Sequence, residues 1–202
     1  RVAQAVTSTV NLQSVLETAA REMAILINAR SVGIGLLNES KSELRIAAYY
    51  SQFDEPSAVG LMIPVEDNLA TKQVIETGQP VLISDAQNTP LQNEATRAVL
   101  RARNTQCLLI LPLLARGEVI GTIAPDTDQP DRVFTSEEIQ LAQTISNQLA
   151  GVIENARLFD ETQRLLEETR KAKEAAETLR AANLALTQNL NLDAICEELL
   201  TL

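Results

Sequence analysis

Two arginines, Arg97 and Arg101, stand four residues apart in a segment, residues 93–102, whose pattern of apolar and polar residues favours a helix. Positions four apart lie on the same face of a helix, so the two guanidinium groups could act together. Paired guanidinium groups suit an anion, because their N–H donors match the geometry of a carboxylate or a phosphate. The spacing predicts an anion site if that helix covers a pocket, and an ordinary charged helix surface if it does not. An apolar or empty pocket fits the sequence equally well.

The chain contains no histidine and only two cysteines, Cys107 and Cys196. Histidine ligation of haem, zinc sites built with histidine and acid–base catalysis by imidazole are therefore excluded within this sequence. Two cysteines this far apart form neither a disulfide framework nor a zinc cluster, and they indicate a reducing, cytoplasmic setting. We expect both to be small buried hydrophobic residues.

The 202 residues carry a formal net charge of −10, from 27 acidic and 17 basic side chains. A surface of this sign repels a phosphate backbone, which argues against direct binding of nucleic acid. No apolar stretch approaches the ~20 residues that cross a bilayer, and nothing resembles a signal peptide. We therefore expect no membrane contact within this sequence.

The spacing of apolar residues along the first half of the chain changes several times between the period of a helix and that of a strand. Residues 11–29 have the apolar rhythm of an amphipathic helix, and residues 32–36 and 44–48 alternate like the two strands of a hairpin. Further strands are expected at residues 61–64, 81–84, 108–114 and 118–123, and further helices at 69–76 and 93–102. Residues 108–114 are almost wholly apolar, as in a strand that is covered on both faces. Pro112 lacks a backbone donor and predicts a local irregularity there.

From Thr135 onward the sequence predicts one long helix, with no proline and no glycine after Gly151. Thr135 and Glu138 form a capping box at its start. Beyond residue 157 two sets of residues recur every seven positions and form a coiled-coil seam: Leu158, Leu165, Ala172, Leu179 and Leu186, and Thr162, Thr169, Ala176, Asn183 and Leu190. The seam is weak, because Thr, Ala and Asn bury little apolar area.

The end of the chain resembles its beginning, since Asn191, Leu192 and Glu197 repeat the order of Asn11, Leu12 and Glu17. No initiator methionine precedes Arg1. We interpret the chain as a fragment of a tandem array. It would hold a sensor domain at 1–157, a coiled-coil signalling linker at 158–190 and the first helix of a following repeat domain at 191–202.

Six stretches resemble a GAF domain and occur in the order of that family: GLMIP (60–64), TGQPV (77–81), ISD (83–85), LPLLARGEVIG (111–121), FTSEE (134–138) and IENARL (153–158). The resemblance implies an α+β fold with a central antiparallel sheet. The first and last helices would pack on one face, and the last would extend into the long coiled-coil helix. Small ligands would bind at the opposite face, under the middle loops and short helices. The segment 166–170 looks like the connector that joins such domains to histidine kinases, cyclases or phosphatases.

The known ligand classes of GAF domains fit this sequence poorly. Phe134, Glu137 and Glu138 resemble part of a cyclic-nucleotide motif, but the Asn-Lys pair of that motif is missing. Cys107 opens an apolar strand and has no histidine beside it, which disfavours a covalent bilin. The free-methionine-sulfoxide reductases of this family use several cysteines, and Cys107 stands alone inside the expected domain. The cofactor is therefore unknown.

The candidate ligand-binding residues are polar groups of the middle region, although each of them taken singly is better explained as a turn former or a helix-surface residue: Tyr50 with its neighbour Tyr49, Asp85, Asn88, Arg97, Arg101 and Asp126. We predict a cytoplasmic, non-catalytic sensory module. It would form a homodimer through residues 158–190 and relay its state to a downstream GAF, kinase, cyclase or phosphatase domain. One alternative is a ligand-free dimerisation or spacer domain, and a second is a redox enzyme of the sulfoxide reductase type.

Overall fold

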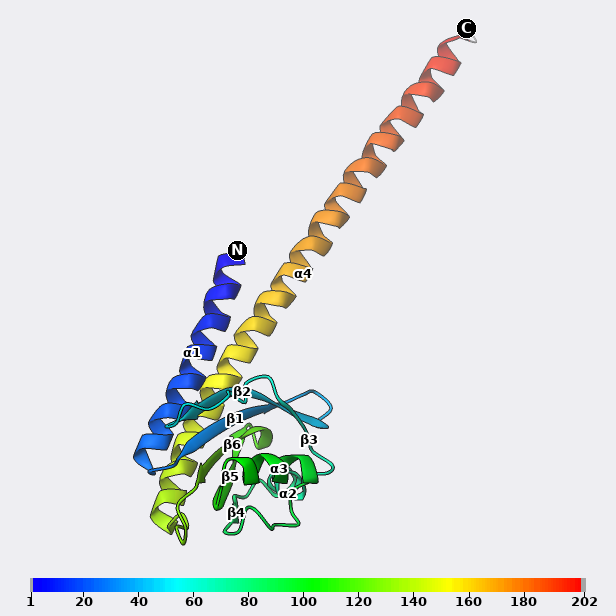
Figure 1. Ribbon diagram of the computed structural model, residues 1–202. Helices are drawn as coiled ribbons and strands as arrows, with labels where there is room; N and C mark the ends of the chain where they lie inside the picture. The colour runs from blue at the N-terminus through cyan, green and yellow to red at the C-terminus, as the bar shows by residue number, and fades with distance from the viewer. Residues whose placement is uncertain (1, 201–202) are drawn as a thin grey trace. The chain divides into compact units, whose positions relative to one another are not determined.

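The computed structural model describes residues 2–200 of the protein, and the side chains of residues 12–187. The strands are β1 (Ser31–Leu37), β2 (Glu43–Ser51), β3 (Met62–Pro64), β4 (Val81–Ile83), β5 (Cys107–Ala115) and β6 (Glu118–Thr127). The helices are α1 (Val2–Leu26), α2 (Leu69–Thr77), α3 (Glu94–Ala102) and α4 (Ser136–Leu200). The strands form one antiparallel sheet in the order β3-β2-β1-β6-β5-β4 (Figure 1). This confirms the predicted central antiparallel sheet.

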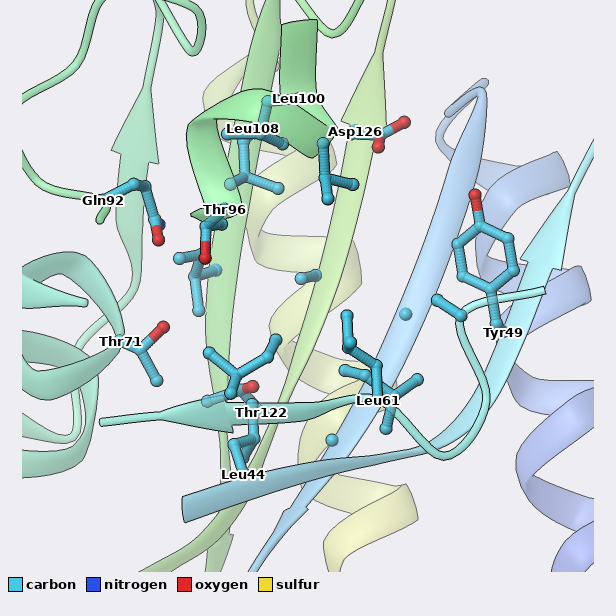
Figure 2. Close-up of a pocket in the computed structure, with 18 of the residues that line it drawn as sticks. Leu44, Tyr49, Leu61, Thr71, Gln92, Thr96, Leu100, Leu108, Thr122 and Asp126 are labelled. Carbon is cyan, nitrogen blue, oxygen red and sulfur yellow. The ribbon is translucent and has the colours of Figure 1, made fainter. Parts of the chain in front are cut away.

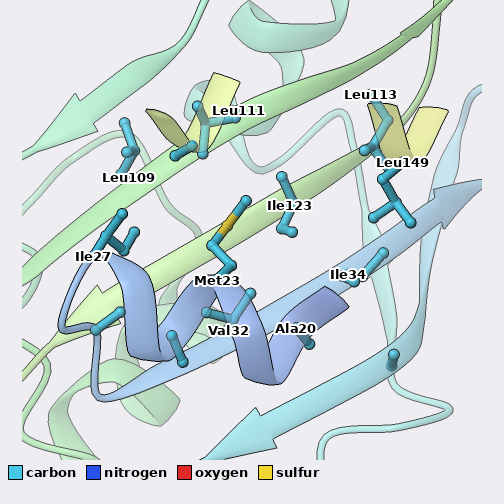
Figure 3. Close-up of a cluster of buried hydrophobic side chains, with 14 of the residues drawn as sticks. Ala20, Met23, Ile27, Val32, Ile34, Leu109, Leu111, Leu113, Ile123 and Leu149 are labelled. Atoms are coloured by element: carbon cyan, nitrogen blue, oxygen red, sulfur yellow. The ribbon is translucent and has the colours of Figure 1, made fainter. Parts of the chain in front are cut away.

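Helices cover both faces of the sheet. Ala20 and Met23 of α1, Ile27 just after that helix and Leu149 of α4 join one large buried cluster with side chains of β1, β5 and β6 (Figure 3). The opposite face carries a smaller cluster from α2, α3, β4 and β5. The first and last helices therefore share one face, as expected, and the two short helices cover the other.

Strand β5 shows why the sequence there is almost continuously apolar. Leu109 and Leu111 belong to the cluster under α1 and α4, whereas Leu108 and Ile110 belong to the cluster under α2 and α3. Successive side chains of a strand point to opposite faces, so a strand covered on both sides needs apolar residues at every position. The register of β5 against β6 shifts between Leu113 and Leu114, one residue beyond Pro112, near which we expected an irregularity.

The boundaries of the helices follow the capping signals in the sequence. Gly78 ends α2 in the left-handed conformation, with φ of 63°. Asn93 starts α3, and its side chain accepts a hydrogen bond from the backbone N–H of Thr96. At the start of α4, Thr135 N–H donates to Glu138 Oε2 at 2.8 Å, and Glu138 N–H donates to Thr135 Oγ1 at 3.3 Å. These two bonds confirm the predicted capping box.

The chain divides into two compact units, residues 1–156 and residues 157–202. The second unit continues α4. The side chains on which the predicted repeat and the domain at 191–202 rest, including Asn11, Asn191 and Glu197, lie outside the described residues, as does Cys196. Among the described helices, none combines the length and the apolar character that crossing a bilayer requires.

Candidate functional site

A cavity of about 220 Å³ lies on the α2 and α3 face of the sheet (Figure 2). Its floor comes from β1, β2, β5 and β6, and its walls come from α3, from the start of α2 and from β3 with the residues before it. Most of the lining is aliphatic, including Leu44, Ile46, Leu61, Leu100, Leu108 and Ile110. This is the face on which the family resemblance implied a ligand site.

Two glycines of β1, Gly33 and Gly35, line the floor of the cavity, and only Gly33 leaves room in it. A Cβ atom added at Gly33 would meet no heavy atom closer than Tyr49 Cδ2, at 3.9 Å. At Gly35 the added atom would come within 2.5 Å of Leu44 Cδ2, so that position has no space. Gly33 is therefore a place where a larger side chain would occupy the cavity without a clash with the backbone.

Asp126 gives the cavity a polar end. Its side chain lines the cavity, is 5% exposed and has one carboxylate oxygen, Oδ1, without a hydrogen-bond partner among the described residues. Burial raises the pKa of Asp126 to about 6, although a hydrogen bond with Ser31 and the charges of Arg30 and Arg103 act in the opposite direction. The ionised carboxylate is thus only partly compensated by its surroundings.

Tyr49 and Arg103 line the same end of the cavity and are held by a network behind it. The guanidinium of Arg103 stands 4.7 Å from the centroid of the Tyr49 ring. The Tyr49 hydroxyl donates to Glu55, which also accepts from Arg30 Nη2 at 2.8 Å. Burial and the bond to Glu55 raise the pKa of Tyr49 to about 12, so its hydroxyl keeps its proton at neutral pH. The tyrosine is therefore a fixed neutral group of the wall.

Gln92, Thr71 and Thr96 form a second polar region, on a different side of the cavity from Asp126 and Tyr49 (Figure 2). Gln92 is 4% exposed and lines the cavity. The walls here are joined by the fully buried Asn68. Its Nδ2 donates to the Pro64 carbonyl at 2.6 Å, and its Oδ1 accepts from Thr96 Oγ1 at 3.0 Å. Asn68 thereby connects β3, α2 and α3 around the cavity.

Of the residues selected from the sequence, Asp126 and Tyr49 line the cavity and Tyr50 does not. Tyr50 packs against the buried cluster on the α1 and α4 face. The two tyrosines are neighbours in β2, so the alternation of a strand sends them to opposite faces. Asp85 and Asn88 line a separate, shallow depression, where Asn88 Nδ2 donates to both carboxylate oxygens of Asp85 at 3.1 Å.

Arg97 and Arg101 lie on one face of α3, but the cavity lining does not include them. Their guanidinium groups converge on Glu94, at 2.7 and 3.2 Å. Arg97 also donates to the carbonyl of Thr89 at 3.3 Å, and Arg101 donates to the carbonyl of Gln87 at 3.1 Å. The two arginines therefore form hydrogen bonds and ion pairs that connect α3 to the segment before it.

Seven polar residues of the lining were not selected from the sequence: Ser31, Thr71, Gln92, Asn93, Thr96, Arg103 and Thr122. Ser31 is opposite Asp126 in the register of β1 against β6. Pairing the predicted first strand with the predicted last strand could have suggested it. Gln92 and Arg103 lie outside the regular elements, just before and just after α3, where no periodic pattern marks a side chain as inward-facing.

Cys107 belongs to the buried cluster on the α1 and α4 face, and the cavity lining does not include it. Burial raises the pKa of its thiol above the usual value. Within the described residues no group of three or more Cys, Asp or Glu side chains is placed to hold a metal ion. The polar chemistry of this site therefore comes from carboxyl, guanidinium, hydroxyl and amide groups.

A family model described as "GAF domain" matches residues 11–153. Among curated proteins, the hybrid signal transduction histidine kinase G of Dictyostelium discoideum is 27% identical over 118 residues. That match covers 58% of this chain and 3% of the kinase, so the chain corresponds to a small part of that protein.

Two solved structures share the fold. The blue-light absorbing form of the PixJ GAF domain of Thermosynechococcus elongatus superposes with a TM-score of 0.66 at 16% identity, covering 80% of this chain and 96% of that one. The type II free methionine-R-sulfoxide reductase of Thermoplasma acidophilum gives a TM-score of 0.59 at 19% identity, covering 73% of this chain and 96% of that one. At such identities the likeness concerns the fold, which serves both kinds of protein.

Proposed function

This chain belongs to the GAF domain family of sensory and signalling modules, and we propose on that basis that it is a non-catalytic sensor that binds a small ligand in the cavity beneath α3. Its ligand-bound state would be relayed through α4, as a homodimer, to an output domain further along the parent protein. A kinase domain is one candidate for that output, because a histidine kinase is among the relatives.

The observation that carries the proposal is the cavity itself. A spacer domain without a ligand needs no cavity of ligand size, whereas ligand sites are concave and mostly apolar with a few convergent polar groups. Here a mostly aliphatic lining borders about 220 Å³, and two buried polar side chains, Asp126 and Gln92, belong to that lining. Asp126 Oδ1 has no hydrogen-bond partner among the described residues. The geometry therefore favours the sensor over the spacer.

The sheet offers a direct mechanical route from the cavity to α4. Leu108 and Ile110 of β5 line the cavity, and the intervening residues Leu109 and Leu111 belong to the cluster that contains Leu149 of α4 (Figure 3). A ligand that shifts β5 would change the surface on which α4 packs, because close-packed clusters transmit small displacements. This contiguity supports a relay, and a difference in ligand affinity between two states would drive it.

The enzymatic alternative is less well supported by the described residues. Thiol–disulfide chemistry needs an accessible thiolate and a second thiol. Cys107 is buried on the face opposite the cavity with a raised pKa, and it is the only cysteine of the residues that match the family model. The reductase of T. acidophilum shares the fold with this chain, and we assign its chemistry to that protein alone.

Native mass spectrometry of the protein purified without added ligand tests the proposal. Gly33→Val should fill the cavity floor, because the position is extended and open to the cavity. We expect a bound small molecule on the wild-type chain and none on Gly33→Val. Gly151→Ala is the matched control, since an added Cβ there meets no neighbour and lies far along the chain on α4. Equal spectra for all three proteins would favour the spacer alternative.

A further inference from the structure

We propose that the ligand of this cavity is a small, mostly apolar molecule with one cationic hydrogen-bond donor, such as an amine, which the carboxylate of Asp126 binds. This inference rests on the proposed function, because it assigns a ligand class to the same cavity. Three features carry it: the size and apolar lining of the cavity, the unpartnered carboxylate oxygen, and the balance of charge around that oxygen.

The apolar lining fixes the body of the ligand. Empty apolar cavities of about 150 Å³ take up benzene, so about 220 Å³ suits one ring with a short substituent. The side chains that would contact this body include Leu44, Ile46, Leu100 and Ile110, and Gly33 leaves the backbone of β1 accessible to it. Such a surface stabilises an apolar group and gives no hydrogen bonds to a polar one.

The carboxylate of Asp126 fixes the position of the donor. A buried acceptor without a hydrogen bond is unfavourable, and a ligand that donates to it removes that penalty. Rotation about χ2 of an aspartate is broad, so either oxygen can turn toward a ligand in the cavity that Asp126 lines. The Tyr49 hydroxyl already donates its proton to Glu55, so it is not free to donate to Asp126. The Oδ1 atom of Asp126 therefore stays without a donor among the described residues.

The charges around Asp126 favour a cation. Arg30 pairs with Glu55 at 2.8 Å and with Asp128 at 3.5 Å, and Arg103 is the second guanidinium that acts on Asp126. Three carboxyl groups therefore face two guanidinium groups, so one negative formal charge is left when all are ionised. Arg103 is itself positioned over the Tyr49 ring and donates to the Pro56 carbonyl at 3.5 Å. An ammonium group would bring the formal charge of this cluster to zero and form a charge-assisted hydrogen bond with Asp126.

Calorimetric titration of the full chain with three probes of similar shape tests the ligand class. Benzylamine carries the ammonium group, toluene lacks any polar group, and benzoate carries the opposite charge. We expect benzylamine to bind most tightly at neutral pH and benzoate most weakly. Asp126→Asn keeps the size of the side chain and removes its charge. It should weaken benzylamine roughly tenfold or more, the usual range for a hydrogen bond to a charged group, and leave toluene within about twofold.

The control and the contrary outcomes separate this inference from the proposed function. Asp85→Asn, the same change outside the cavity, should leave all three affinities unchanged. Tighter binding of benzoate than of benzylamine, or unchanged benzylamine binding in Asp126→Asn, would overturn the ligand class. The cavity would still be a ligand site if Gly33→Val abolished the binding of toluene. Absence of binding by all three probes, or toluene binding that Gly33→Val leaves intact, would overturn both proposals.

Discussion

At the scale of single residues, Asp126 is the group on which folding and the proposed ligand binding place opposite demands. Its side chain is buried between β1 and the cavity, and burial disfavours the ionised form. Ser31, Arg30 and Arg103 compensate only in part. A hydrophobic residue there would suit the fold better, and a buried carboxyl group at this place is in keeping with the proposed binding role.

Asp126→Asn should change how stability depends on pH. The folded-state pKa of about 6 lies above the ordinary value of 3.8, so the folded protein holds this proton more tightly than the unfolded chain. The favourable contribution is complete below about pH 4 and is lost as the pH rises through 6. The ligand-free variant should therefore be more stable than the wild type at pH 7, by at most about 3 kcal/mol for a shift of this size.

Urea unfolding between pH 4 and 7.5 measures this effect as the difference in free energy between the two proteins. Glu55 and Glu138 have lowered pKa values, so each makes the free energy of unfolding rise with pH. Both proteins contain these residues, so their contributions cancel in the difference. The free energy of unfolding of Asp85→Asn should depend on pH in the same way as that of the wild type. A difference for Asp126→Asn that is the same at every pH would contradict the assignment.

At the scale of elements, the start of α4 is fixed by short-range contacts that also reach α1. Arg132 Nη2 donates to the carbonyl of Ile27, just after α1, at 2.7 Å and to Glu138 Oε1 at 3.0 Å. Burial would raise the pKa of Glu138, but hydrogen bonds from Thr135 and Arg132 outweigh it and hold that pKa below its usual value. Glu138, part of the motif that resembles a cyclic-nucleotide site, therefore stabilises the start of α4.

Thr135→Ala should lower the free energy of unfolding by about 1 kcal/mol, because it removes the side-chain cap of α4. The midpoint of denaturant unfolding measures this, with an unchanged slope as evidence of a two-state comparison. Thr144→Ala is the control, since Thr144 bonds only back to the Gln140 carbonyl within the helix and alanine favours a helix interior. Equal effects of the two changes would mean that the cap contributes nothing of its own.

At the scale of the whole molecule, the seam of the second unit has no apolar partner within the described chain. Leu165, Leu179 and Leu186 are all exposed, although they recur at one position of the predicted heptads. Helices in proteins gain most of their stability from packing of an apolar face against a partner. A second copy of the chain, aligned in parallel, would cover these leucines and bring Asn183 of the two copies together, which fixes register at some loss of stability.

Leu179→Glu should therefore convert a dimer into a monomer, whereas Leu184→Glu should not. The two leucines are exposed to a similar extent, 67% and 57%, but only Leu179 lies on the predicted seam. Sedimentation velocity at tens of micromolar distinguishes the two states, and a chain truncated after Arg157 should behave like the Leu179 variant. Dimers that survive both the substitution and the truncation would show that another surface makes the main contact.

The sequence by itself determined most of the secondary structure, because caps, turns and periodicity are local. Gly78 and the pair Thr135 and Glu138 stand at the helix boundaries that the structure shows. The apolar run through β5 indicated a strand covered on both faces. The coiled-coil seam of α4 and the repeat domain at 191–202 stay predictions at this level.

Only the tertiary structure decided which polar residues share a cavity. Tyr49 and Tyr50 are indistinguishable in the sequence, and the orientation of β2 in the sheet sends one to the cavity and the other to the opposite face. The Arg97 and Arg101 pair has local partners, while Arg103 reaches the site. Ser31 meets Asp126 only because the first strand pairs with the last. Strand order and register arise from packing across the whole sheet, and a local pattern does not contain them.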